Sequence, residues 1–146
     1  MKTETICIAV DFDGTCVTHE FPEIGADIGA APILRALVKK GHRLILNTMR
    51  SNNGDLPLFS ASGEITLTSG NFLDDAVNWF SQNEIPLYGI QVNPDQKGWT
   101  SSPKCYAQLY IDDAALGCPL RYPENGDRPY VDWVEIVGLL EKQGIL

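Results

Sequence analysis

Two pairs of carboxylates stand where apolar segments of the chain end. Asp11 and Asp13 close the stretch TICIAVDFD, and Asp112 and Asp113 directly follow the stretch AQLYI. Side chains alternate along a strand, so Asp11 and Asp13 can face the same way. If the two segments are neighbouring strands, four carboxylates converge on a small volume, and like charges that close need compensation. A hard divalent cation with oxygen ligands supplies it, and Mg²⁺ is the natural candidate.

A hydroxyl group and basic side chains accompany these acids. Thr48, Met49 and Arg50 follow the apolar stretch RLILN, and Lys104 lies just before the segment that ends on Asp112. Thr48, Lys104 and free backbone N–H groups suit an anion. Carboxylates, a metal ion, a lysine and a hydroxyl are together what phosphoryl transfer needs. The charge on the transferring group must be neutralised and the attacking group must be held in line.

Patterns of buried strands and amphipathic helices alternate along the chain. Near-continuous apolar runs predict strands buried on both faces, and apolar residues at helical spacing predict helices. The predicted strands span residues 5–12, 43–47, 86–92 and 107–111, and the predicted helices span residues 29–40, 71–83 and 130–143. This alternation is typical of an α/β domain with a mainly parallel sheet and right-handed crossovers. Ligands of such sheets bind beyond the carboxyl ends of the strands, where the acids lie.

Two longer stretches interrupt the alternation. Residues 51–70 contain two short apolar runs around a Ser-Gly turn, which predicts a small β-hairpin within residues 56–68. Residues 93–103 indicate an irregular loop, and long loops at strand ends commonly contact substrates. A fifth strand is not evident, because residues 116–122 are few and include Pro119. The sheet therefore either stops at four main strands or adds a short edge strand.

Length and composition fit one globular domain. The chain has 146 residues, of which 44% are hydrophobic and 21% charged, and its net charge is -8. These values exclude a disordered or collagen-like chain. Together with the alternating elements, they make a single Rossmann-like three-layer domain over residues 1–146 the expected architecture. A net acidic chain without a basic run argues against duplex nucleic acid or an anionic membrane as a partner. A bound metal ion would still allow a small phosphorylated substrate.

Membrane and export signals are missing from the sequence. No apolar run is long enough to span a bilayer, and the N-terminus has no signal-peptide core or cleavage site. Four cysteines are scattered without CxxC spacing or paired histidines, which argues against zinc. Thiols without an export signal indicate a reduced, cytoplasmic protein.

The acids, the hydroxyl and the lysine resemble the motifs of the haloacid dehalogenase-like (HAD) superfamily. Its first motif, an apolar strand followed by DxDGT, matches residues 11–15. Its second motif, a Thr or Ser that ends the next strand, matches Thr48. Its third, a lysine, matches Lys104, and Lys97 in the same loop is the rival farther from the acidic strand. Its fourth, an acidic pair at a strand end, matches residues 112–113, and all four stand in the family's order.

The resemblance implies catalytic roles for the first two acids. Asp11 would be the nucleophile that forms an aspartyl-phosphate, and Asp13 would protonate the leaving group and then activate water. An acid at the Asp13 position implies phosphate-ester chemistry, since dehalogenases and phosphonatases lack it.

The resemblance also implies a metal site and a phosphate site. Mg²⁺ would be held by the Asp11 carboxylate, the Asp13 backbone carbonyl and Asp112, with Asp113 binding directly or through water. Thr48 and Lys104 would hold the phosphoryl oxygens. Met49 and Arg50, which follow Thr48, are assigned to the same phosphate-binding set.

The short intervals between the motifs imply a capless or minimally capped member of the superfamily. Such members have an open site or borrow a lid from a neighbouring subunit, so a homodimer is a hypothesis. The predicted function is a Mg²⁺-dependent phosphatase acting on a nucleotide or a sugar phosphate. The alternative is a catalytically silent protein of the same fold that binds a phosphorylated ligand or has a regulatory role. The motif order excludes a response-regulator receiver domain, whose acidic pair comes first, and the acidic net charge argues against processing of nucleic-acid ends.

The remaining distinctive side chains receive structural roles. His19 and His42 are expected to be structural or surface groups, and Trp79 and Trp133 are expected in the core because they stand at helical spacing. Trp99 lies in the loop before the predicted lysine, where it either anchors packing or stacks on a substrate ring.

Overall fold

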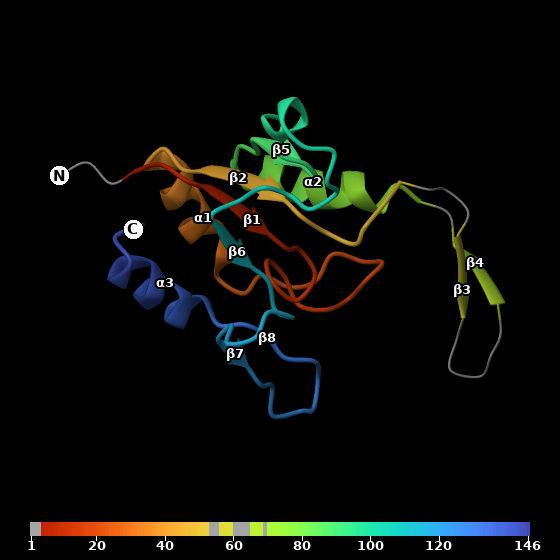
Figure 1. Cartoon of the computed structure of the whole chain (residues 1–146). Coiled ribbons are helices and arrows are strands. Elements are labelled where there is room, and N and C mark those ends of the chain that lie inside the picture. The colour runs from red at the N-terminus through yellow and green to blue at the C-terminus, as the bar shows by residue number, and fades with distance from the viewer. Residues whose placement is uncertain (1–3, 53–55, 60–64, 69) are drawn as a thin grey trace.

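A four-stranded parallel sheet forms the centre of the molecule (Figure 1). The computed structural model describes residues 4–52, 56–59, 65–68 and 70–146. The strands are β1 (Cys7–Val10), β2 (Arg43–Leu46), β5 (Gly89–Ile90) and β6 (Leu109–Ile111), in the order β5-β2-β1-β6. This confirms a Rossmann-like α/β architecture with a mainly parallel sheet. The strands are shorter than the apolar runs that predicted them, because residues at the ends of those runs do not pair with a neighbouring strand.

Three helices cover one face of this sheet. They are α1 (Ala30–Lys39), α2 (Phe72–Gln82) and α3 (Trp133–Lys142). Their buried side chains form one core with alternate residues of the strands, among them Ile8, Val10 and Leu44. Trp79 and Trp133 belong to this core, as predicted. In the part of the chain that the structure describes, no helix is long and apolar enough to cross a membrane.

The opposite face of the sheet is covered by an irregular segment in place of a helix. Cys7, Ala9 and Ile45 pack there against Cys105 and half-buried neighbours. The covering segment follows β5 and contains only the short 3-10 helix η1 (Gln96–Gly98). Residues 93–103 form an irregular loop, as predicted, but that this loop supplies the third layer of the expected three-layer domain was not predicted.

Buried amide side chains hold this covering loop in place. Gln96 donates from Nε2 to the carbonyls of Ser102 (3.1 Å) and Lys104 (2.9 Å) and accepts from the Tyr106 N–H (2.8 Å). Asn93 donates to the Tyr106 carbonyl at 2.9 Å. The backbone around Lys104 is thereby fixed beside the sheet without a helix.

The predicted hairpin forms between β2 and α2. Strands β3 (Leu56–Phe59) and β4 (Ile65–Thr68) pair antiparallel, while residues 60–64 lie outside the described part. Figure 1 shows the pair projecting away from the sheet. At the base of the hairpin, Asn52 Nδ2 donates to Asp74 Oδ1, and the Asp74 backbone N–H donates to Asn52 Oδ1.

The C-terminal region differs from its predicted boundaries. Residues 130–131, predicted to begin the last helix, instead form β8 (Tyr130–Val131), which pairs antiparallel with β7 (Leu120–Arg121). Helix α3 begins later because Asp132 is its N-cap: the Asp132 carboxylate accepts from the Val134 and Glu135 N–H groups. The main sheet stops at four strands, and β7 belongs to a separate ribbon.

Candidate active site

Three carboxylates meet at the carboxyl ends of β1 and β6. These strands pair in parallel, so Asp11 and the pair Asp112–Asp113 leave the sheet side by side, and the Asp11 N–H donates to the Ile111 carbonyl at 3.0 Å. One carboxylate oxygen from each of Asp11, Asp112 and Asp113 lies within 4.8 Å of the others. All three side chains belong to half-buried residues. Of the four carboxylates that the sequence predicts to converge, these three do so, and the fourth, that of Asp13, is paired with Arg50 instead.

The hydroxyl of Thr15 joins the two ends of the cluster. Thr15 is fully buried, its Oγ1 donates to Asp11 Oδ2 at 2.7 Å, and it accepts from the Asp113 N–H at 3.1 Å. The indole of Trp133 donates to the Thr15 carbonyl at 2.7 Å. Helix α3 therefore helps to hold the turn that orients Asp11.

Gly14 is required by the packing of this turn. Its φ is +80°, a left-handed conformation that favours glycine. A Cβ at this position would collide with the His19 ring and approach Asp113 Oδ2. The glycine of the DxDGT sequence thus makes room for the side chains that complete the acidic cluster.

Burial and neighbouring charge shift the pKa of Asp11, the candidate nucleophile. Burial raises the pKa of Asp11 from 3.8 to about 7; the hydrogen bond from Thr15 opposes this rise, and the charge of Asp112 adds to it. A cation among the three carboxylates would relieve this repulsion. Oxygen ligands of this kind suit a hard ion such as Mg²⁺, so the donor set fits the metal expected from the sequence.

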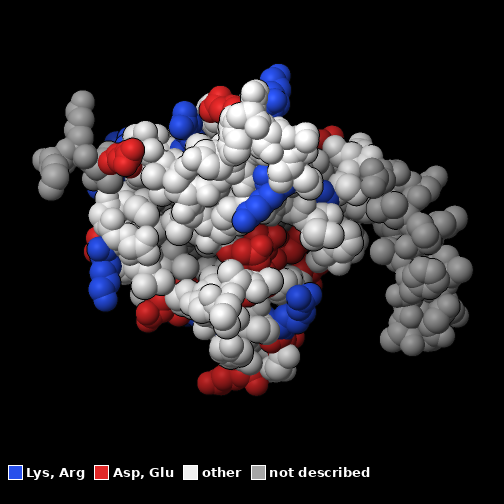
Figure 2. Space-filling model, in the orientation of Figure 1, with Lys and Arg blue, Asp and Glu red and all other residues white. Residues whose placement is uncertain are grey.

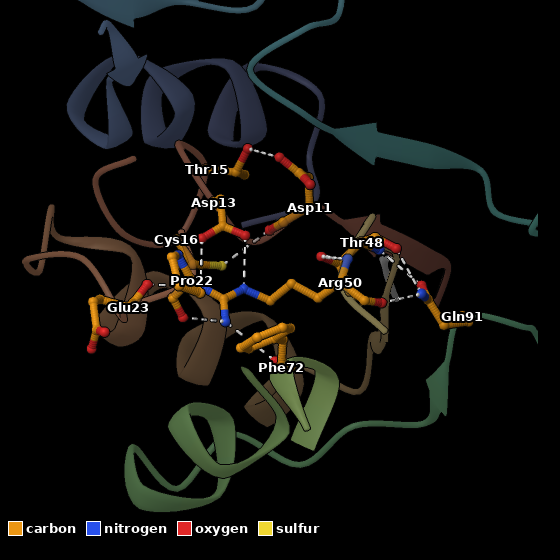
Figure 3. Close-up of polar contacts among 10 residues, drawn as sticks. All are labelled: Asp11, Asp13, Thr15, Cys16, Pro22, Glu23, Thr48, Arg50, Phe72 and Gln91. Carbon is orange, nitrogen blue, oxygen red and sulfur yellow. Dashed lines mark hydrogen bonds and ion pairs between the residues drawn. The ribbon is translucent and has the colours of Figure 1, made fainter. Parts of the chain in front are cut away.

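Asp13 points to a different partner from the other acids. Its carboxylate forms a bidentate ion pair with Arg50, with Nε–Oδ2 and Nη2–Oδ1 distances of 2.8 Å each. Figure 3 shows the Arg50 side chain crossing from the Thr48 end of β2 to Asp13. Asp13 therefore stands beside the metal-candidate cluster, and the role of its backbone carbonyl as a metal ligand stays a prediction.

Every N–H of the Arg50 guanidinium has an acceptor. Besides Asp13, it donates to the carbonyls of Pro22 (3.2 Å), Glu23 (2.8 Å) and Phe72 (3.2 Å). The side chain is 1% exposed and stacks over the Phe12 ring at 5.1 Å. In this arrangement it has no donor left for a phosphate. Arg50 instead ties the segment after β1 and the start of α2 to Asp13.

The end of β2 is fixed by Gln91. Thr48 donates its N–H to Gln91 Oε1 at 2.8 Å, and Gln91 Nε2 donates to the Thr48 carbonyl at 2.6 Å. The Thr48 hydroxyl accepts from the Arg50 N–H at 3.1 Å, and among the described residues its own proton has no acceptor, so it can donate to an anion. The neighbouring Met49 side chain is exposed. Two hydrogen bonds to Gln91 thus fix the backbone that carries the predicted phosphate-binding hydroxyl.

The two candidate motif lysines lie on the exposed covering loop. Neither Lys104 nor Lys97 forms an ion pair with a carboxylate among residues 4–52, 56–59, 65–68 and 70–146. Figure 2 shows acidic side chains at the floor of a hollow, with basic side chains on both sides of it. The choice between the two lysines stays a prediction.

His19 joins the acidic cluster, a position that its sequence context did not predict. Its Nε2 lies 2.8 Å from Asp113 Oδ2, and the side chain is 13% exposed. The two residues are 94 positions apart, so no local pattern links them. The other histidine is structural, as predicted: the ring of His42 is buried between the Ile6 N–H and the Ile145 carbonyl.

Comparison with known proteins yields one informative match. No family model matches the sequence, and no match is found among curated proteins. A solved structure, that of a conserved protein coded by a locus of Bacteroides thetaiotaomicron, is similar to the chain. The two are 30% identical, the match covers 96% of this chain and 93% of that one, and the TM-score is 0.67.

Proposed function

We propose that this chain, which belongs to the same family as the conserved Bacteroides thetaiotaomicron protein, hydrolyses a phosphate monoester through an aspartyl-phosphate on Asp11, with Mg²⁺ as its metal. The observation that carries the proposal is the convergence of Asp11, Asp112 and Asp113 within 4.8 Å at the carboxyl ends of adjacent parallel strands. The ordered HAD-like motifs of the sequence support it.

In the first step, an Asp11 carboxylate oxygen attacks phosphorus. A new P–O bond to Asp11 forms while the ester P–O bond breaks, and the departing oxygen takes a proton. Asp13 is the candidate donor, and it must first release Arg50, because both of its oxygens accept from the guanidinium. The opening of that ion pair is therefore part of the proposed mechanism.

In the second step, water attacks the phosphorus of the aspartyl-phosphate. Asp13 accepts the proton of the water, the bond from phosphorus to Asp11 breaks, and inorganic phosphate leaves. A Mg²⁺ ion held by Asp11, Asp112 and Asp113 would neutralise charge on the phosphoryl oxygens. The Thr48 hydroxyl and the Lys104 amine are the candidate phosphate ligands of the chain itself.

The test is phosphate release from a generic aryl phosphate, nucleotides and sugar phosphates, with Mg²⁺ or with a chelator. Asp11→Asn should reduce turnover by a factor on the order of 10³ or more, because it removes the nucleophile. Asp75→Asn, at an exposed acid of the first turn of α2, is the matched control and should retain turnover. Turnover that survives both the chelator and Asp11→Asn would refute the proposal.

The engagement of Asp13 by Arg50 favours a second candidate, a protein that binds a phosphorylated ligand without hydrolysing it. Its site would keep the ion pair closed, and Asp13 would be structural. Mg²⁺-dependent binding of a phosphorylated ligand without release of phosphate would establish this alternative.

A further inference from the structure

A cavity adjoins the acidic cluster at His19. It has a volume of about 580 Å³, which falls in the usual range of small-molecule sites. Its walls are the segment after β1, represented by Thr18, His19 and Glu20, and the loop between β7 and β8. In Figure 1 that loop lies below the carboxyl ends of β1 and β6.

His19 connects this cavity to the candidate active site. Its ring lines the cavity, and the same ring contacts Asp113 at 2.8 Å. The cavity thus adjoins the acidic cluster through His19, while Asp11, Asp112 and Asp113 do not themselves line it. From this juxtaposition we infer that the cavity binds the leaving group of the substrate, an inference that rests on the proposed function.

The lining indicates the chemistry of that leaving group. The lining residues carry both donors and acceptors: hydroxyls on Thr18 and Tyr130, carboxylates on Glu20 and Asp127, and the guanidinium of Arg128. Arg128 is exposed and forms no ion pair within the described residues. Its donors are therefore available to a ligand.

Charge and shape favour a neutral, hydroxyl-rich group. Glu20 and Asp127 offset Arg128, so the cavity offers no net positive charge to a second anionic group. Tyr130 is the sole Phe, Tyr or Trp among the lining residues, and the other ring, that of His19, is held against Asp113, so the lining offers little aromatic surface on which a nucleobase would stack. The cavity thus takes the sugar of a sugar monophosphate.

The competing location is a smaller cavity of about 410 Å³ beside Lys104. It is lined by Trp99 and Tyr106, whose rings pack edge to face at 5.2 Å, and Trp99 is 63% exposed. An aromatic surface of this kind would suit a nucleobase. The cavity at His19 therefore predicts a preference for sugar phosphates, and the cavity at Lys104 predicts one for nucleotides. Substitutions in each cavity can distinguish the two.

The experiment compares kcat/KM for glucose 6-phosphate, AMP and p-nitrophenyl phosphate in the full-length protein with Mg²⁺. The readout is the ratio of kcat/KM for the sugar phosphate to that for the aryl phosphate. Arg128→Ala should lower this ratio about tenfold or more, because it removes charged hydrogen bonds to the sugar. Trp99→Ala, the matched control in the other cavity, should leave the ratio unchanged. An unchanged ratio in Arg128→Ala, or a fall confined to Trp99→Ala, would overturn the inference.

A binding measurement separates this inference from the proposed function. Calorimetry of glucose 6-phosphate with Asp11→Asn, alone and combined with Arg128→Ala, reports the cavity without turnover. If the wild type hydrolyses nothing, but glucose 6-phosphate binds and Arg128→Ala weakens it about tenfold, the sugar site stands and the phosphatase proposal falls. If Arg128→Ala leaves the affinity unchanged, or if no binding is detected, the sugar site falls whatever the aryl phosphate assay shows.

Discussion

The ion pair between Arg50 and Asp13 should be strongly coupled. The Arg50 side chain is 1% exposed and that of Asp13 is 19% exposed, with two contacts of 2.8 Å between them. Removal of one partner from a buried pair typically destabilises a protein by about 3–5 kcal/mol. Since water can reach part of Asp13, Arg50→Met should lower the free energy of unfolding by about 3 kcal/mol.

The magnitude follows from what Arg50→Met leaves behind. Both carboxylate oxygens of Asp13 lose their donor, and so do the carbonyls of Pro22, Glu23 and Phe72. The double variant Asp13→Asn/Arg50→Met removes both charges. Its loss of stability should therefore be smaller than the sum of the single losses, by about 2–3 kcal/mol.

The assay is urea denaturation of the wild type, the two single variants and the double variant, in chelator at pH 7. The control cycle uses Arg121 and Asp132, a pair at 3.6 Å in which the arginine side chain is 57% exposed. The coupling energy of this solvent-exposed pair should not exceed about 0.5 kcal/mol. If Arg50→Met does not fold, Arg50→Lys keeps the charge but cannot reach all the acceptors, and it enters the cycle instead. A coupling between Asp13 and Arg50 as small as that of the control would refute the reasoning.

Two further predictions concern the acidic cluster. Because the pKa of Asp11 is raised to about 7, the proton stabilises the metal-free fold at low pH, and this contribution is lost as the pH rises through 7. Protons therefore compete with Mg²⁺, and the Mg²⁺ affinity measured by calorimetry should be about tenfold weaker at pH 6 than at pH 8; an affinity that does not change with pH would contradict this. Gly14→Ala should destabilise the protein by at least about 1–2 kcal/mol from its positive φ alone and weaken Mg²⁺ binding, since the new Cβ displaces His19 and Asp113. A thermal melt with and without Mg²⁺ checks both effects, and an Ala variant with the wild-type response to Mg²⁺ would count against the assigned packing.

The parts of the structure that were predictable from sequence are those with a local signal. Every residue of β1 is buried, and the strand is therefore visible in the sequence as an uninterrupted apolar run that ends at Val10. The acids that follow it lie at the sheet edge because parallel strands end at a common side. The hairpin within residues 56–68 was predictable from its turn and flanking runs, and β3 pairs antiparallel with β4.

The features that were missed depend on contacts between distant parts of the chain. His19 reaches Asp113 across 94 positions, and Arg50 reaches Asp13 across 37. Such pairings leave no periodicity in the sequence, so Arg50 was indistinguishable from a phosphate ligand before its acceptors were known. The start of α3 was misplaced because Tyr130 and Val131 also continue an apolar helical stripe, and the cap at Asp132 overrides it.

The clamp at the base of the hairpin has a consequence for how this domain could be remodelled. Asn52 and Asp74 hold the two ends of the excursion together with contacts of 2.9 and 3.1 Å. The length of the segment between these two residues affects the free energy of unfolding mainly through the entropy of loop closure. Doubling that length costs only about 0.6 kcal/mol. The position next to Arg50 is thus a natural graft point, where a longer module can be exchanged for the hairpin without repacking the core. The hairpin can therefore be varied while the sheet and the acidic cluster at its carboxyl end stay as they are.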